Sequence, residues 1–209
     1  MDGLLEFLKH LVNPESIIVH GGLIFLLFVV FAETGLFIGF FLPGDSLLFT
    51  AGLLCATGIL KIHIFLLVLL IIISAIIGNM FGFIFGKKVG VLLFQKKSTF
   101  IFKQEHLQAA KEFYFKHGGM ALILCRFLPI VRTFAPIVAG IVKLDFLRFF
   151  LYSTIGGVAW VCCLVLGGYF LASYIPNLKD YLGYIVLFLI AITSVPLILR
   201  AVHKKKPEK

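Results

Sequence analysis

Long apolar runs dominate the pattern of hydrophobic and polar positions along this chain. Three of them, 62–85, 149–175 and 181–199, contain no Asp, Glu, Lys or Arg. Each is long enough for the roughly 20 residues that a helix needs to cross a bilayer. A fourth run, 16–32, has 17 residues and is just long enough. The pattern therefore predicts four transmembrane helices.

Two further apolar segments, 33–60 and 119–142, are interrupted by charges and prolines and do not fit an ordinary crossing helix. The interrupting positions are Glu33, Pro43 and Asp45 in the first segment, and Arg126, Pro129, Arg132 and Pro136 in the second. A broken backbone at membrane depth is tolerated only where protein or water satisfies its polar groups. Both segments are predicted to be re-entrant, entering the membrane and returning on the same side.

The distribution of basic residues supports this topology, because Lys and Arg are retained on the cytoplasmic side. If both segments re-enter, 15 basic residues are cytoplasmic and two, Lys61 and Lys179, are outside. If both cross, the division is 8 inside and 9 outside. The re-entrant topology places both termini in the cytoplasm.

The two interrupted segments resemble each other. The motif Phe-Leu-Pro at 41–43 recurs at 127–129, and each copy is followed by Ala-Gly, at 51–52 and 139–140. On the favoured topology the copies enter from opposite sides, which makes an inverted repeat, and such repeats place substrate sites at the membrane midplane. The predicted fold is an all-α membrane protein with two re-entrant hairpins facing each other and about four transmembrane helices.

The remaining segments complete a single membrane domain over 1–209. The loop 86–117 is predicted to be cytoplasmic and to contain an amphipathic helix lying at the membrane surface. The segment 200–209 is a basic cytoplasmic tail. Gly78, Gly82 and Gly86 recur every four residues and would let another helix approach closely. These glycines and Trp160 could face a partner subunit in a homo-oligomer, but internal packing is favoured.

Composition sharpens the assignment to the membrane. Hydrophobic residues make up 61% of the chain and charged residues 14%, with a mean hydropathy of +1.09, whereas soluble domains have about 45–50% and about 25%. Disorder, a disulfide scaffold and a nucleic-acid-binding module are excluded. The net charge of +9 is read as a topology signal. The four cysteines have no metal-ligand spacing, and neither metal nor cofactor is expected.

Four ionisable residues, Glu33, Asp45, Arg126 and Arg132, are the candidate site. Each costs about 2.5–3.5 kcal/mol at the centre of a membrane helix, so they must be paired or lie in a polar cavity. Two structural ion pairs are one reading, and helix capping alone could explain Asp45. The other is a cavity for a charged substrate.

Residues that interrupt the backbone are expected to shape this cavity: Gly35, Pro43, Gly44, Pro129 and Gly140. Pro129 breaks the helix between Arg126 and Arg132, which would otherwise point in different directions. Two converging guanidinium groups suit a phosphate, which each can bind through two hydrogen bonds.

The order of these motifs resembles the DedA family, also called the VTT-domain or SNARE-associated family. The matching positions are an acid at Glu33, Pro-Gly-Asp at 43–45, the pattern R-x-x-P-x-x-R at 126–132, and Ala-Gly at 139–140. The resemblance covers about residues 15–200. Many members have Asp and Tyr where this chain has Asn79 and Phe83, and Met where it has Leu144.

The resemblance implies lipid translocation in the bacterial cytoplasmic (inner) membrane. Bacterial members are similar to flippases that return undecaprenyl phosphate to the cytoplasmic leaflet with a dependence on proton motive force. Others act on phosphatidylethanolamine, and distant relatives are scramblases. The resemblance also implies that residues matching the four charged positions are needed for activity. The expected partners are a phosphate-bearing membrane lipid and protons.

The mechanism expected from both lines of argument divides the charges by role. Arg126 and Arg132 bind the lipid phosphate, while Glu33 and Asp45 balance the arginines in the empty site and take up protons when the anion arrives. A small-ion or drug–proton antiporter is the alternative, although two arginines disfavour a cationic substrate. An enzyme of lipid metabolism is disfavoured because the histidines lie away from the arginines and G-x-S-x-G is missing.

Overall fold

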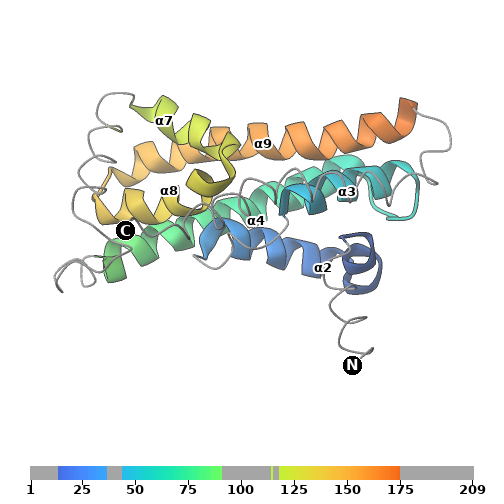
Figure 1. The fold of residues 1–209 in the computed structure, drawn as a ribbon, viewed down its shortest axis with the longest axis horizontal. Helices are drawn as coiled ribbons and strands as arrows, with labels where there is room; N and C mark the ends of the chain where they lie inside the picture. The colour runs from blue at the N-terminus through green and yellow to red at the C-terminus, as the bar shows by residue number, and fades with distance from the viewer. Residues whose placement is uncertain (1–13, 37–43, 91–113, 115–117, 175–209) are drawn as a thin grey trace, which may run out of the picture. The chain divides into compact units, whose positions relative to one another are not determined.

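The computed structural model describes residues 14–36, 44–90, 114 and 118–174, and every regular element in these ranges is helical (Figure 1). The elements are α2 (Pro14–Gly35), α3 (Gly44–Ala56), α4 (Ile64–Phe85), the π-helical turn η2 (Gly86–Gly90), α7 (Gly119–Leu124), the 3-10 turn η3 (Cys125–Phe127), α8 (Pro129–Ile141) and α9 (Phe146–Tyr174). The predicted span 181–199, the tail 200–209 and the amphipathic helix within 86–117, apart from Tyr114, lie outside the described residues.

The chain forms two compact units. The first contains residues 1–26, 43–64 and 164–209, and the second contains 27–42 and 65–163. Helices α2 and α9 contribute to both units, each of which is described here by itself.

Two described helices are long and apolar enough to cross a membrane. They are the stretch Ile64–Lys88, which contains α4, and α9, with 25 and 29 residues. At 1.5 Å per residue both exceed the roughly 30 Å hydrocarbon core. The exposed face of α4 is apolar, as Phe65, Leu69 and Ile73 illustrate. Its buried face is mostly apolar or small and also carries two polar residues, Ser74 and Asn79, so the polar side chains of α4 face away from the outer apolar surface.

Helix α2 differs from the prediction of one regular helix over 16–32. The backbone of Gly22 has φ 66°, in the left-handed region that glycine adopts without a steric penalty, so α2 is kinked there. The helix also continues beyond residue 32 to Gly35. Glu33 therefore lies in the last helical turn, where its side chain has a fixed direction.

In the second unit, Gly78 of α4 and Gly86 of the following turn η2 allow close helix packing, as the sequence predicted. A Cβ on Gly78 would collide with the Thr34 hydroxyl on α2, and a Cβ on Gly86 would collide with the carbonyl of Ile137 on α8. Gly140 of α8 is just as close, because a Cβ there would strike the carbonyl of Phe83. Backbone contacts of this kind hold α4 against both neighbours.

An apolar cluster packs beside these contacts. Phe83 stacks on Phe149 of α9 with ring centroids 4.6 Å apart, and both rings are buried with Leu122 and Ala139. The cluster joins α4, α7, α8 and α9 through residues far apart in the sequence.

In the first unit, α3 packs against the C-terminal part of α9. A Cβ on Gly52 would collide with the carbonyl of Val165, and one on Gly168 with the carbonyl of Phe49. The local structure thus repeats, because α3 and α8 each have 13 residues and each carries an Ala-Gly glycine packed on a long helix.

At about 20 Å, neither α3 nor α8 alone spans a bilayer core of about 30 Å. Their lengths favour the re-entrant topology. The inverted relation between the two hairpins stays a prediction.

Candidate functional site

The backbone breaks where the sequence predicted. Helix α7 ends at Leu124, the turn η3 follows, Leu128 is extended (φ −105°, ψ 107°), and Pro129 begins α8. Proline suits the first position of a helix, because the amide hydrogen it lacks would have no partner inside the helix. The break leaves Arg126 in η3 and places Arg132 in the first turn of α8.

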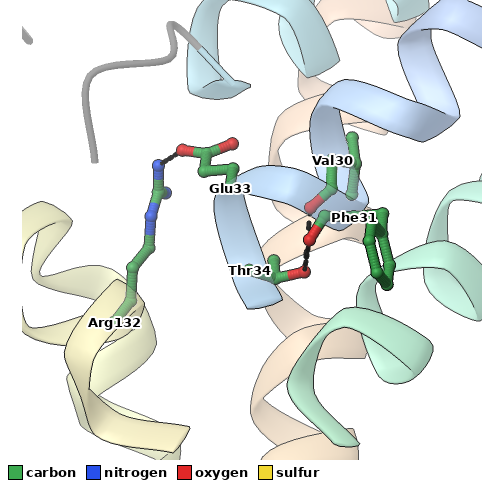
Figure 2. A network of polar contacts seen from close by, with 5 residues as sticks. All are labelled: Val30, Phe31, Glu33, Thr34 and Arg132. Carbon is green, nitrogen blue, oxygen red and sulfur yellow. Dashed lines mark hydrogen bonds and ion pairs between the residues drawn. The ribbon is translucent and has the colours of Figure 1, made fainter. Parts of the chain in front are cut away.

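Arg132 forms a buried ion pair with Glu33 of α2 (Figure 2). The two side chains are 7% and 2% exposed. The guanidinium also lies over the ring of Trp160 on α9, 4.7 Å from its centroid, in the geometry of a cation–π interaction. Three helices thus meet at Arg132.

The end of α2 is held locally. The hydroxyl of Thr34 donates a hydrogen bond of 2.8 Å to the carbonyl of Val30, one turn earlier (Figure 2). This bond from a threonine hydroxyl to the carbonyl one turn earlier satisfies the buried hydroxyl within its own helix.

Arg126 has a different environment. Its residue is 2% exposed, and Nη2 donates a hydrogen bond of 2.6 Å to the hydroxyl of Ser153 on α9. Nη1 is buried and has no hydrogen-bond partner among the described residues. Gly156 makes room for the side chain, because a Cβ there would lie 3.0 Å from Arg126 Cγ.

The charges of the second unit do not balance around Arg126. Two carboxylates are described in this unit: Glu33 pairs with Arg132, and Asp145 is exposed and accepts a hydrogen bond from the backbone of Arg148. Within the described part of the unit, Arg126 therefore has a hydroxyl partner and no anionic one.

Both arginines nevertheless reach one face of α9. Ser153 and Trp160 are seven residues apart, which is two helical turns or about 10 Å. The two contact points are about 10 Å apart, so the predicted convergence of the two guanidinium groups on one phosphate stays a prediction.

The remaining predicted residues have mixed outcomes. Asp45 is half-buried in the first turn of α3, which begins at Gly44, and its role as a helix cap stays a prediction. A carboxylate there still interacts favourably with the helix dipole. Because Asp45 belongs to the first unit, its convergence with the other three charges stays a prediction. Gly35 ends α2, and Pro43 lies outside the described residues.

The prediction for Gly140 needs a correction. It was expected to interrupt the backbone, but it lies inside α8. Its missing side chain serves close packing on α4.

Three polar or aromatic residues near the site were not among the predicted site residues. Ser153 is a buried hydroxyl in an apolar run, and that contrast was the available signal. Trp160 was expected to pack internally, which its 4% exposure confirms, but its contact with Arg132 was not foreseen. Asn79 is 1% exposed, and neither of its amide atoms has a hydrogen-bond partner among the described residues.

In the described residues, fold and site together are those of a helical protein with two candidate membrane spans and two buried arginines on either side of a helix break. The comparison with known families agrees: residues 42–170 match the VTT domain. The chain belongs to this family, which includes DedA.

Curated relatives cover most of the chain. It is 35% identical to Protein DedA of Escherichia coli (strain K12) over 207 residues, 97% of this chain and 94% of that protein. It is 34% identical over 192 residues to an uncharacterized membrane protein of Mycobacterium leprae (strain TN), covering 92% of this chain and 85% of the relative. The inner membrane protein YqjA of Escherichia coli (strain K12) is 36% identical over 164 residues, 78% of this chain and 72% of YqjA.

No solved structure matches the chain significantly. Membership of the VTT-domain family indicates a membrane protein of the transporter type.

Proposed function

We propose that this protein moves a phosphate-bearing lipid, undecaprenyl phosphate in the first instance, across the bacterial cytoplasmic membrane. The observation that carries the proposal is the environment of Arg126, a buried guanidinium whose described partner is the neutral hydroxyl of Ser153.

A buried charge without a counter-ion is unfavourable, and the arrival of an anion removes that penalty. Lipid phosphate is an anion that the membrane itself supplies. A guanidinium recognises it with planar, charge-assisted hydrogen bonds while the lipid tail stays in the bilayer.

Proton coupling follows from the second arginine. An incoming phosphate competes with Glu33 for Arg132. A carboxylate that loses its cation in a low-dielectric site favours its neutral form and takes up a proton. In this mechanism the phosphate and the proton enter the site together, which couples transport to the proton motive force. Asp45 is assigned the same role in the first unit.

Binding can be followed with the protein's own fluorescence, because the chain has one tryptophan and its ring contacts Arg132. Undecaprenyl phosphate is titrated into purified protein in detergent, with undecaprenol as the control, and the emission of Trp160 is recorded. We expect a saturable change with the phosphate only. Equal affinity for both lipids would refute recognition of the head group.

Lysine variants test the guanidinium geometry. Arg126→Lys and Arg132→Lys each keep a positive charge but lose the planar fork of donors. Loss of one charged hydrogen bond costs about 1.5–3 kcal/mol, so we expect each variant to bind about 10- to 150-fold more weakly. Unchanged affinity in both would leave the arginines a purely electrostatic role.

Transport is tested with the protein in liposomes that carry undecaprenyl phosphate or phosphatidylethanolamine, with and without a proton gradient. Movement of undecaprenyl phosphate that is accelerated by the gradient is the expected result. If only phosphatidylethanolamine moved, it would be the substrate in place of undecaprenyl phosphate.

A further inference from the structure

Asn79 is a buried polar residue that the mechanism above does not use. It lies on α4, is 1% exposed, and both Nδ2 and Oδ1 are buried without hydrogen-bond partners among the described residues. A side-chain amide offers two donors and an acceptor, and leaving such a group buried and unpaired is costly. The position is therefore suited to a ligand that enters the unit.

The relative directions of the helices show which residue of α9 lies level with Asn79 in the second unit. On α8, Arg132 contacts Trp160 and Ala139 packs with Phe149, so α9 runs antiparallel to α8.

Helix α4 runs parallel to α8, because Gly82 lies against Pro136 and Lys87 lies against Gly140 further along both helices. Within the second unit, α4 and the N-terminal part of α9 are therefore antiparallel.

The stacked rings of Phe83 and Phe149 fix the register between these two helices. Asn79 is four residues before Phe83, and Ser153 is four residues after Phe149. Each is about 6 Å along its axis from the stacked pair, on the same face as its phenylalanine. Asn79 and Ser153 therefore lie at the same level, and Ser153 binds Arg126.

We propose that Asn79 completes the head-group site together with Arg126 and Ser153, and that this site takes a phosphate monoester as its monoanion. The inference rests on the proposed function and names the form of phosphate that it recognises. The guanidinium and the amide NH2 donate to unprotonated phosphate oxygens. The amide oxygen accepts from the single P–OH group.

Charge and hydrogen bonding agree on the monoanion. In the empty site, before an incoming phosphate competes with Glu33 for Arg132, the described interior of the unit carries one uncompensated positive charge, on Arg126, so the form that first binds there is a monoanion. A phosphate monoester has its second pKa near 6, so its monoanion is accessible close to neutral pH. A phosphodiester carries the same charge but has no P–OH to donate to Asn79.

The test compares Asn79→Leu, which has a similar size but no polar atoms, with a matched control on the same helix. In the control, Ser74→Ala removes a hydroxyl that donates a satisfied hydrogen bond of 2.6 Å to the Leu27 carbonyl. Affinity for undecaprenyl phosphate, undecaprenol and inorganic phosphate is measured by Trp160 fluorescence, and the unfolding temperature is measured in detergent.

We expect Asn79→Leu to bind undecaprenyl phosphate at least about 10-fold more weakly, with an unfolding temperature equal to or above wild type. Ser74→Ala should lower the unfolding temperature and leave affinity unchanged. Unchanged affinity in Asn79→Leu, whether or not stability falls, would make Asn79 a structural residue and overturn the inference.

A second variant covers the case in which Asn79→Leu does not fold. Asn79→Asp keeps the shape but adds a negative charge beside Arg126, so it should reduce phosphate affinity. Affinity equal to or above wild type would overturn the inference.

Two further results separate this inference from the function it rests on. If wild type binds phosphate and alcohol equally, the proposed function fails. If inorganic phosphate binds as tightly as the lipid, the ligand is the free ion and the lipid assignment is overturned.

Discussion

In the buried ion pair, Glu33 should have a coupling free energy with Arg132 that it does not have with Arg126. Breaking a buried pair by neutralising one member costs about 3–5 kcal/mol, because the other charge is left uncompensated. Both side chains are less than one-tenth exposed, so this range applies to Glu33→Gln. Arg132→Met also loses the contact with Trp160, which is worth up to about 2 kcal/mol when desolvated.

A double-mutant cycle isolates the pair. Glu33→Gln, Arg132→Met and the double variant are unfolded thermally in detergent. At about 2–4 °C per kcal/mol for a chain of this size, Glu33→Gln should lower the unfolding temperature by about 6–20 °C. Because the second neutralisation removes the orphaned charge, the double variant should be more stable than the sum of the singles predicts, by about 2–3 kcal/mol.

Arg126 supplies the matched control, since it is an equally buried arginine that has a hydroxyl partner. Glu33→Gln combined with Arg126→Met should be additive within about 0.5 kcal/mol. Additivity in the Arg132 cycle, or an equal coupling of Glu33 to both arginines, would refute the pairing.

Two further predictions concern packing and topology. Gly140→Ala should destabilise the protein by about 1–3 kcal/mol, because the added Cβ meets the Phe83 carbonyl. Gly157→Ala has open space within 4 Å and should be neutral or stabilising by up to about 1 kcal/mol. Thermal unfolding of both variants measures the difference, and equal effects would contradict the close contact at Gly140. If the second hairpin is re-entrant, a cysteine placed at Lys143 in a background without the native cysteines should resist labelling from outside intact cells while one at Lys61 reacts, and labelling at Lys143 would show a full crossing.

The sequence by itself determined the features that depend on local chemistry. A run of apolar residues is long enough to cross a bilayer wherever it occurs, so α4 and α9 could be predicted. Pro129 cannot continue a helix from the preceding turn, so the break between Arg126 and Arg132 was predictable too. The glycines at four-residue spacing on α4 and at the start of η2 likewise fall on one face by periodicity alone.

The tertiary structure decided which partner each of the two arginines has. The sequence offered two acids and two arginines without assigning pairs, and Glu33 and Arg132 are 99 positions apart. Arg126 and Ser153 are 27 positions apart in the sequence. The helix faces that carry them meet because of close glycine contacts and the stacking of aromatic rings. Pairing inside a membrane protein depends on which helix faces meet, and a linear pattern of charges does not contain that information. For this reason the two arginines look equivalent in the sequence, while the folded unit gives one a carboxylate and leaves the other beside a neutral hydroxyl.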